Sequence, residues 1–271
     1  MKKLAWLTLM LLGSCTMLMA QPDSDDDDNV PEVLDKNGDP KNVGIIYNTE
    51  FAVGGGVHTN GFNLSFQYGW LKKYYLTKIF YADFGMLKHP KEYRQSYDYV
   101  PQWSQNSPKP FVYGKQNSFY VIRVGYGEKR YFSDKAKKRG IAIGASYSAG
   151  VSLGLLKPYY LDIVYPGSSP NSYDIRSEPY STENASYFLN LDRIYGSSGA
   201  GLGWGGIKPI PGGYARAGLL FDWGAFDSFL KDIEVGGMID VYYKRVPIML
   251  TEQNYPFFAN LYINIHFGKR S

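Results

Sequence analysis

The stretch from Ile141 to Leu155, with the sequence IAIGASYSAGVSLGL, most strongly constrains what this chain can fold into. Every second residue from Ile141 is apolar, and the residues between them are only Gly, Ala and Ser. A period of two indicates a β-strand with two different faces. Because the apolar face suits lipid and the small residues suit a narrow, crowded interior, we interpret the stretch as one strand of a membrane β-barrel. A strand of a soluble sandwich or of a lipocalin-like barrel is the alternative.

The same alternation recurs along most of the chain, and it predicts about eight strands, an even number as closed outer-membrane barrels have. The expected strands cover residues 44–57, 62–72, 77–88, 117–127, 141–155, 213–224, 231–245 and 257–267. No open edge can face lipid, so the last strand should pair with the first. The predicted fold class is all-β, a transmembrane antiparallel β-barrel with long extracellular loops and both termini in the periplasm.

The composition agrees with this fold. Aromatic residues make up 17% of the 271 residues, and there are 30 glycines. Aromatic residues favour strands, and glycine favours tight turns and crowded interiors. The mean hydropathy is −0.30, as expected when only alternate residues face lipid. The formal net charge of +4 gives no reason to expect a nucleic-acid partner.

The N-terminus has the pattern of an export signal. A basic start is followed by an apolar run and small residues, so we predict a signal peptide over residues 1–20. The LGSC sequence ending at Cys15 also resembles a lipoprotein box, and both removal and acylation of this cysteine stay open. Residues 21–42 are acidic and almost free of aromatics, which predicts a disordered linker. The outer-membrane β-barrel domain is expected over residues 43–271.

Charged residues fall on the inward face of several predicted strands. An eight-stranded barrel is barely wide enough for its own side chains, and buried charges must pair. We therefore predict a salt-bridged plug; a path for protons or ions through the same groups is the alternative. The predicted lumen charge network consists of Glu50, Asp83, Arg123, Arg216, Asp222, Glu234, Asp240 and Lys244. Other basic residues, among them Lys129 and Arg270, are expected on the periplasmic rim.

The chain has three histidines, and two of them, His58 and His89, are expected at the extracellular rim. A histidine with a serine and an acid suits acyl transfer, and a histidine pair with a carboxylate such as Glu92 suits zinc. No GxSxG, HExxH or paired-cysteine motif supports either reaction. We therefore predict no catalytic residue, no cofactor and no metal site.

Several short motifs, taken together, resemble a largely uncharacterised family of small outer-membrane β-barrel proteins from Bacteroidota-type bacteria. They are HTNGF (58–62), KHPKE (88–92), YGKQNSFYVIRVGYGEKR (113–130), SLGLLKPYYL (152–161), FDWG (221–224), VPIM (246–249) and LYINIHFGKR (261–270). The resemblance implies a barrel in the cell outer membrane and offers no catalytic residues. Some small barrels of these bacteria are subunits of outer-membrane assembly or type IX secretion machinery, which by analogy implies a scaffolding role.

Two long connections, residues 89–116 and 156–211, are rich in Tyr and Trp, and the second includes a predicted short helix over 182–194. Aromatic side chains on loops suit protein recognition. The loop recognition candidates are Trp103, Tyr159, Tyr160, Tyr187 and Trp204. The expected partners are outer-membrane lipids and a protein bound through the extracellular loops. We expect a structural or scaffolding subunit of an envelope assembly or secretion complex; a narrow channel and a rim-located lipid-modifying enzyme are the alternatives.

Overall fold

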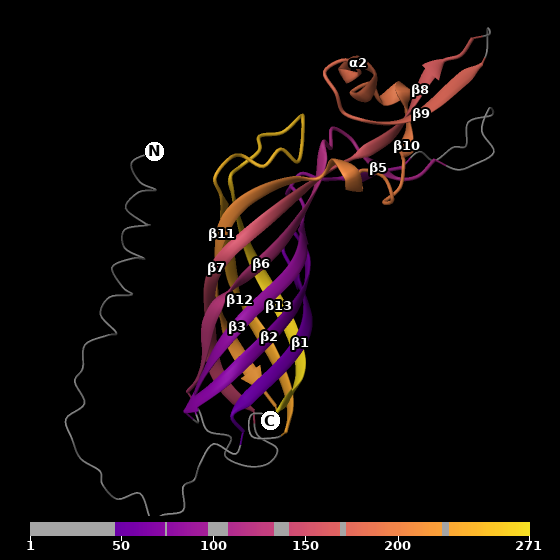
Figure 1. Cartoon of the computed structure of the whole chain (residues 1–271). Helices are drawn as coiled ribbons and strands as arrows, with labels where there is room; N and C mark the ends of the chain where they lie inside the picture. The colour runs from indigo at the N-terminus through magenta and orange to yellow at the C-terminus, as the bar shows by residue number, and fades with distance from the viewer. Residues whose placement is uncertain (1–46, 74, 97–107, 133–140, 169–171, 224–227) are drawn as a thin grey trace, which may run out of the picture. The chain divides into compact units, whose positions relative to one another are not determined.

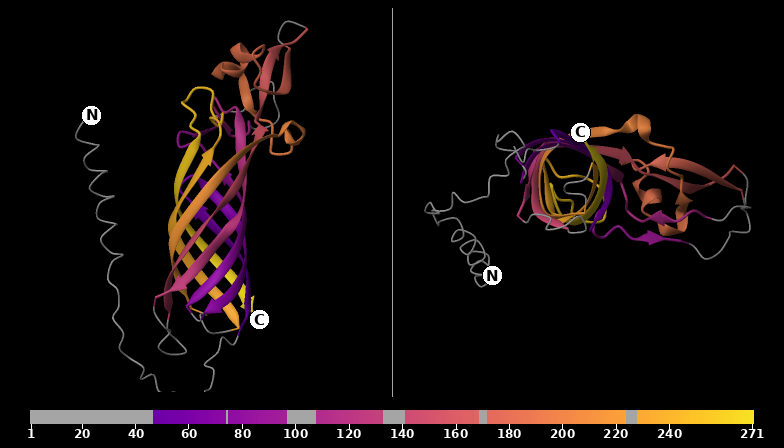
Figure 2. Two further views of the ribbon diagram at one scale, coloured as in Figure 1. Left: turned by 60° about the vertical axis from the view of Figure 1, so that its left-hand side comes forward. Right: turned by 90° about the horizontal axis from the view of Figure 1, so that it is seen from below.

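The chain forms a closed antiparallel β-barrel of eight strands in the order β1-β13-β12-β11-β7-β6-β3-β2 (Figure 1). The computed structural model describes residues 47–73, 75–96, 108–132, 141–168, 172–223 and 228–271. The predicted signal peptide, linker and Cys15 lie outside these residues. The barrel strands are β1 (Thr49–His58), β2 (Gly61–Lys73), β3 (Leu76–Leu87), β6 (Asn117–Tyr131), β7 (Ala142–Pro158), β11 (Lys208–Asp222), β12 (Phe229–Tyr242) and β13 (Phe257–Arg270). Viewed from below in Figure 2, the strands form a ring. The predicted all-β, closed antiparallel barrel of about eight strands is confirmed.

The first and last strands close the barrel, as expected. β1 pairs with β13 from Glu50 opposite Arg270 to His58 opposite Tyr262. Beyond these pairs, the backbone N–H of Ser271 donates to the carbonyl of Thr49 at 2.9 Å, and the N–H of Thr49 donates to the carbonyl of Ser271 at 2.8 Å. The ladder therefore has no open edge, which is what a β-structure needs in lipid.

The barrel wall is apolar along the middle of its outer face, and its inner face carries buried charged and polar side chains. Val57, Val151 and Leu261 are 62–69% exposed on the outside, whereas alternate residues of the same strands are buried. A soluble barrel has the opposite distribution, with large apolar side chains inside. The alternatives of a soluble sandwich or lipocalin-like barrel are therefore wrong, and the distribution is that of an outer-membrane barrel.

Aromatic side chains gather near both ends of the outer wall. Tyr68 and Trp70 pack edge to face at 5.0 Å near one end, and Phe84 and Tyr120 stack at 5.9 Å near the other. Aromatic girdles at the two membrane surfaces are a property of outer-membrane barrels. We call the end with the long connections the loop end, and the end with Thr49 and Arg270 the terminus end.

The two long connections contain their own secondary structure. Residues 88–116 include β4 (Arg94–Gln95) and β5 (Phe111–Val112), which pair with each other. Residues 159–207 contain a three-stranded sheet in the order β10-β8-β9 together with short helices. Their elements are β8 (Tyr160–Pro166), β9 (Tyr173–Pro179), α2 (Ala185–Phe188), η1 (Leu191–Arg193), β10 (Ile194–Ser197) and η2 (Trp204–Gly206). The sequence predicted only the helix here, and the observed helix is much shorter than residues 182–194.

The two connections share a small apolar core. Phe111 of the first connection is buried with Leu161, Ile163, Phe188 and Ile194 of the second. The hydroxyl of Tyr113 also donates to the carbonyl of Leu189 at 2.9 Å. We call residues 108–115 and 159–207, apart from the undescribed 169–171, the loop head. In the part of the chain that the structure describes, no helix is long and apolar enough to cross a membrane.

Val151 lies near the middle of β7, on the outer wall. We expect Val151→Arg to lower the free energy of unfolding by about 2–4 kcal/mol, because it places a cation in the hydrocarbon region. Denaturant titration of the barrel in lipid vesicles, followed by tryptophan fluorescence, measures this change. Ile175→Arg, at an exposed position of β9, is the matched control and should change stability little. Equal losses in both variants would contradict the lipid-facing assignment.

Candidate functional site

The lumen carries buried ion pairs at three levels, and the level nearest the loop end is built around Arg123. Its Nε and Nη2 donate to the two carboxylate oxygens of Asp240 at 2.6 and 2.9 Å, and its Nη1 donates to Asp83 at 2.9 Å. Asp83 lies opposite Arg123 in the β3–β6 register, whereas Asp240 reaches it from β12 across the lumen. The guanidinium therefore ties three strands together through a bidentate and a single charge-assisted contact.

The middle level is built around Arg216 of β11. Its guanidinium forms an ion pair with Glu234 at 2.7 Å. The same group lies 4.2 Å from the ring centroid of Tyr81 and 4.5 Å from that of Tyr262, so two aromatic faces flank the cation. The hydroxyl of Tyr262 donates to Glu234 at 2.6 Å. The cation and carboxylate are thus held by contacts from β3, β11, β12 and β13.

The level nearest the terminus end joins two cations to three carboxylates. Lys129 lies 3.2 Å from Glu50 and 3.3 Å from Asp232. Arg270 lies 3.3 Å from Glu50 and 2.7 Å from Asp222. Glu50 therefore links the two cations. His266 adds a further contact, with its Nδ1 2.6 Å from Asp232 and its Nε2 2.9 Å from the side-chain nitrogen of Gln67.

Seven of the eight residues predicted for the lumen lie inside it, and Lys244 does not. The predicted seventh strand ran to residue 245, but β12 ends at Tyr242. Lys244 therefore falls in the following connection, where it is exposed and lies 5.2 Å from the ring of Tyr243. The alternation of inward and outward residues applies only while the strand continues, so the assignment of Lys244 to the lumen was wrong.

Lys129 and Arg270 were expected on the rim and instead lie in the lumen, where they are 0% and 3% exposed. The reason is that β6 and β13 extend further than predicted, to Tyr131 and to Arg270 itself. The predicted lumen network did not include Lys129 or Asp232. Each lies an even number of positions from a lumen residue of its own strand, Lys129 from Arg123 and Asp232 from Glu234, so each points inward. Continuing the alternation to the strand ends would have found them.

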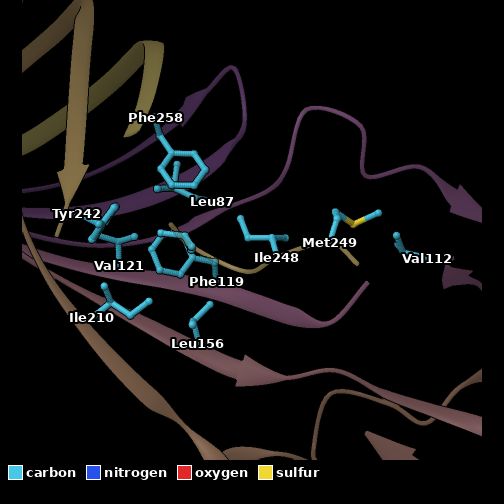
Figure 3. Close-up of a cluster of buried hydrophobic side chains, with 11 residues drawn as sticks. Leu87, Val112, Phe119, Val121, Leu156, Ile210, Tyr242, Ile248, Met249 and Phe258 are labelled. Carbon is cyan, nitrogen blue, oxygen red and sulfur yellow. The ribbon is translucent and has the colours of Figure 1, made fainter. Parts of the chain in front are cut away.

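An apolar cap closes the lumen at the loop end. Phe119, Leu156, Tyr242 and Phe258 point inward from four strands and pack with Ile248 from the β12–β13 connection (Figure 3). The other members are Leu87, Val112, Val121, Ile210, Val246 and Met249. The carbonyl of Ile248 accepts the N–H groups of Gln116 at 2.8 Å and Asn117 at 3.2 Å, which fixes the connection in the barrel mouth.

The small inward face of β7 makes room for this cap. A Cβ atom added at Gly154 would stand 2.5 Å from the ring of Phe119 and 3.0 Å from that of Tyr242. Those distances are too short for a carbon contact, whose optimum is about 3.5–4.0 Å. The glycine therefore allows two large rings to fill the lumen beside the strand.

The side chains of both rim histidines are buried. His58 lies at the loop end, where β1 ends, but it is 8% exposed and therefore buried. His89 is 7% exposed; its Nε2 lies 3.2 Å from the carbonyl of Gln253, and its Nδ1 accepts the N–H of Lys91 at 3.2 Å. Glu92 is paired with Lys115. Among the described residues, no group of three or more His, Cys, Asp or Glu is arranged to hold a metal ion.

Of the loop recognition candidates, Trp103 lies outside the described residues. The other four divide into residues that pack within the loop head and residues that are more exposed. The hydroxyl of Tyr159 accepts the N–H of Val112 at 3.3 Å, and Tyr187 packs on Tyr165 at 4.8 Å. Both therefore hold the loop head together. Tyr160 is half-buried, whereas Trp204 is 55% exposed. Trp204 is the described candidate most available for contact.

We expect Arg123→Met to lower the free energy of unfolding by about 3–5 kcal/mol, because it leaves Asp83 and Asp240 buried without their cation. Unfolding in lipid vesicles and the mobility of unheated protein on denaturing gels measure the loss. Adding Asp83→Asn and Asp240→Asn to the same variant removes the unpaired charges and should restore part of the stability. Wild-type stability of Arg123→Met would contradict the role assigned to this ion pair.

No protein-family model matches the chain, and no curated protein matches it. Among solved structures, the chain is similar to the N-terminal β-barrel domain of Pseudomonas aeruginosa OprF, with 8% identity, a TM-score of 0.33 and coverage of 82% of this chain and 98% of that one. Neisserial surface protein A (NspA) has 8% identity, a TM-score of 0.36 and coverage of 82% and 96%. A major outer membrane protein from Thermus thermophilus has 7% identity, a TM-score of 0.38 and coverage of 82% and 99%. The assignment of this chain as an outer-membrane barrel rests on its own strand pairing and side-chain distribution.

Proposed function

We propose that this protein is a non-conducting outer-membrane barrel that serves as a structural or scaffolding subunit of an envelope assembly or secretion complex. The single observation that carries the proposal is the filled lumen. Three levels of paired charges occupy its length, and Phe119, Ile248 and Phe258 lie in the apolar cap at its mouth. A barrel filled in this way is suited to act as a rigid membrane anchor for the loops that it carries.

The loop head is the part that we propose binds a protein partner. It has its own core, and its surface presents large apolar side chains, with Tyr173, Ile175, Leu202 and Trp204 between 40% and 55% exposed. β9 is an edge strand of the three-stranded sheet, and edge strands offer backbone groups for pairing with another chain. An ordered platform with exposed aromatic residues favours recognition over transport.

The two alternatives have less support. A narrow channel needs a continuous polar path, whereas the apolar cap interrupts the lumen at the loop end. A rim enzyme needs free histidine and carboxylate groups, whereas His89 contacts Gln253 and Lys91, and Glu92 is paired with Lys115. We also propose, from the quoted motifs, that the chain belongs to the small outer-membrane barrels of Bacteroidota-type bacteria.

We expect the purified barrel to give no steady conductance in planar lipid bilayers, because ions cannot pass the apolar cap without displacing packed side chains. A general porin in the same bilayers serves as the positive control. A variant with Ile248→Gly and Met249→Gly, which opens the cap while leaving the ion pairs, tests whether the cap is the main barrier. Sustained conductance of the unmodified protein would contradict the proposal and favour the channel.

We expect that replacing residues 159–207 with a short Asn-Gly turn leaves a folded barrel, because β7 and β11 pair directly along their length. The variant should lose the proteins that co-purify with the intact chain from detergent-solubilised outer membrane. Ile175→Asp and Trp204→Ala test the exposed surface without removing the sheet. An unchanged set of co-purifying proteins in all three variants would contradict recognition through the loop head.

A further inference from the structure

A cavity of about 570 Å³ lies at the loop end, against the outer wall of the barrel. Its wall includes Phe62 of β2, Met86 of β3 and Tyr120 of β6. These residues face outward, because their neighbours Leu87 and Phe119 point inward to the apolar cap. Residues of the loop head cover the other side. The cavity therefore lies outside the barrel wall, although Val112 of the apolar cap also lines it.

The cavity is strongly basic. Five cationic side chains line it, namely Lys88, Arg94, Lys109, Lys115 and Lys157, and the acidic residue among its lining is Glu92. Five positive charges and one negative charge leave an excess of four. Glu92 is paired with Lys115, so its carboxylate does not neutralise the other four cations. A concentration of like charge around one cavity favours an anionic ligand.

Two of these cations are held in place before any ligand binds. Lys115 is 4% exposed, and burial lowers the pKa of its ammonium although Glu92 opposes this effect. Lys157 is 5% exposed; its ammonium donates to the carbonyl of Ala200 and lies 4.4 Å from the ring centroid of Trp204. An ammonium has three donors, so Lys157 keeps donors for a further acceptor.

On the barrel side of the cavity, Phe62, Met86 and Tyr120 form an apolar patch that continues the membrane-facing wall, beside the polar Ser118 and Lys157 of the same wall. Phe62 is 46% exposed, and Tyr120 stacks on both Phe84 at 5.9 Å and Trp204 at 6.0 Å. This aromatic cluster lies in the girdle at the loop end, where the membrane surface is expected. Cations thus lie beside hydrocarbon-facing residues at the depth of lipid headgroups. That arrangement fits an amphiphile better than a soluble anion.

We propose that this cavity binds the phosphate-bearing headgroup of a lipid of the outer leaflet, with its acyl chains along Phe62, Met86 and Tyr120. The basic residues supply charge-assisted hydrogen bonds to phosphate oxygens, and Arg94 adds a planar guanidinium suited to bidentate contact. The lipid would also bring the loop head and the outer wall together, because its ligands come from both. The inference stands whether or not the loop head binds a protein.

The test uses the full chain in neutral detergent and native mass spectrometry with three probes: a bisphosphorylated lipid A, its enzymatically dephosphorylated form and inorganic phosphate. We expect saturable binding of the phosphorylated lipid, at least tenfold weaker binding of the dephosphorylated lipid, and weaker binding at high salt. Equal affinity for the two lipids would overturn the role of the phosphate. Affinity for inorganic phosphate equal to that for the lipid would overturn the lipid assignment.

Variants locate the site. Lys157→Gln and the double variant Arg94→Gln with Lys109→Gln should each weaken binding of the phosphorylated lipid at least tenfold. Arg94 and Lys109 are exposed, so the double variant should fold even if Lys157→Gln does not; heat-modifiable mobility on gels checks folding. Lys231→Gln, at the opposite end of the barrel, is the matched control and should bind as the unmodified protein does. Unchanged binding in the folded double variant would overturn the proposed site.

Discussion

The neutralisation of buried carboxylates by buried cations is the interaction on which this barrel depends. An eight-stranded barrel has no room for a wide water-filled lumen, so a charge inside it must find its partner among the other side chains. Arg123 meets two carboxylates, Arg216 meets Glu234 between two tyrosine rings, and Lys129 and Arg270 share Glu50. Two of these contacts, Arg123 with Asp240 and Lys129 with Glu50, join strands that are not neighbours in the wall, and so they brace the barrel across its lumen. A barrel stabilised from within leaves the middle of its outer wall free to be apolar.

Packed side chains of the apolar cap connect the lumen to the loops. The apolar cap is built partly from the barrel strands and partly from the β12–β13 connection, and Val112 of the cap adjoins Phe111 of the loop-head core. The loop head is therefore continuous with the barrel interior through packed side chains. The proposed lipid cavity lies on the outer side of the same junction, where Lys157 and Tyr120 of the wall meet Trp204 of the loop head. Partner binding and lipid binding would thus act on neighbouring parts of one packed region.

The sequence predicted the residues within strands better than the strand ends. Side chains alternate between the two faces of a strand, so one correctly oriented residue fixes the face of all the others in that strand. Glu50, Arg123 and Asp240 were placed inside for this reason. The assignment was wrong for Lys244 and Arg270, because no turn residue marked where β12 and β13 end. The partner of Arg123 could not be read from one sequence, since Asp240 is 117 positions away and meets it only after the barrel closes. The three-stranded sheet was missed because its strands are short and lie within a long connection, although Tyr173 and Ile175 of β9 do alternate with Asp174 and Arg176.

The joint between β1 and β13 has a consequence for biogenesis. Thr49 and Ser271 are separated by 222 positions, yet their backbones are hydrogen-bonded to each other. The hydrogen bonds between β1 and β13 therefore cannot form until the last strand has crossed the inner membrane. During that interval two strand edges are unsatisfied, and such edges pair readily with other chains. The chain is therefore open to pairing with other chains until its two ends have joined.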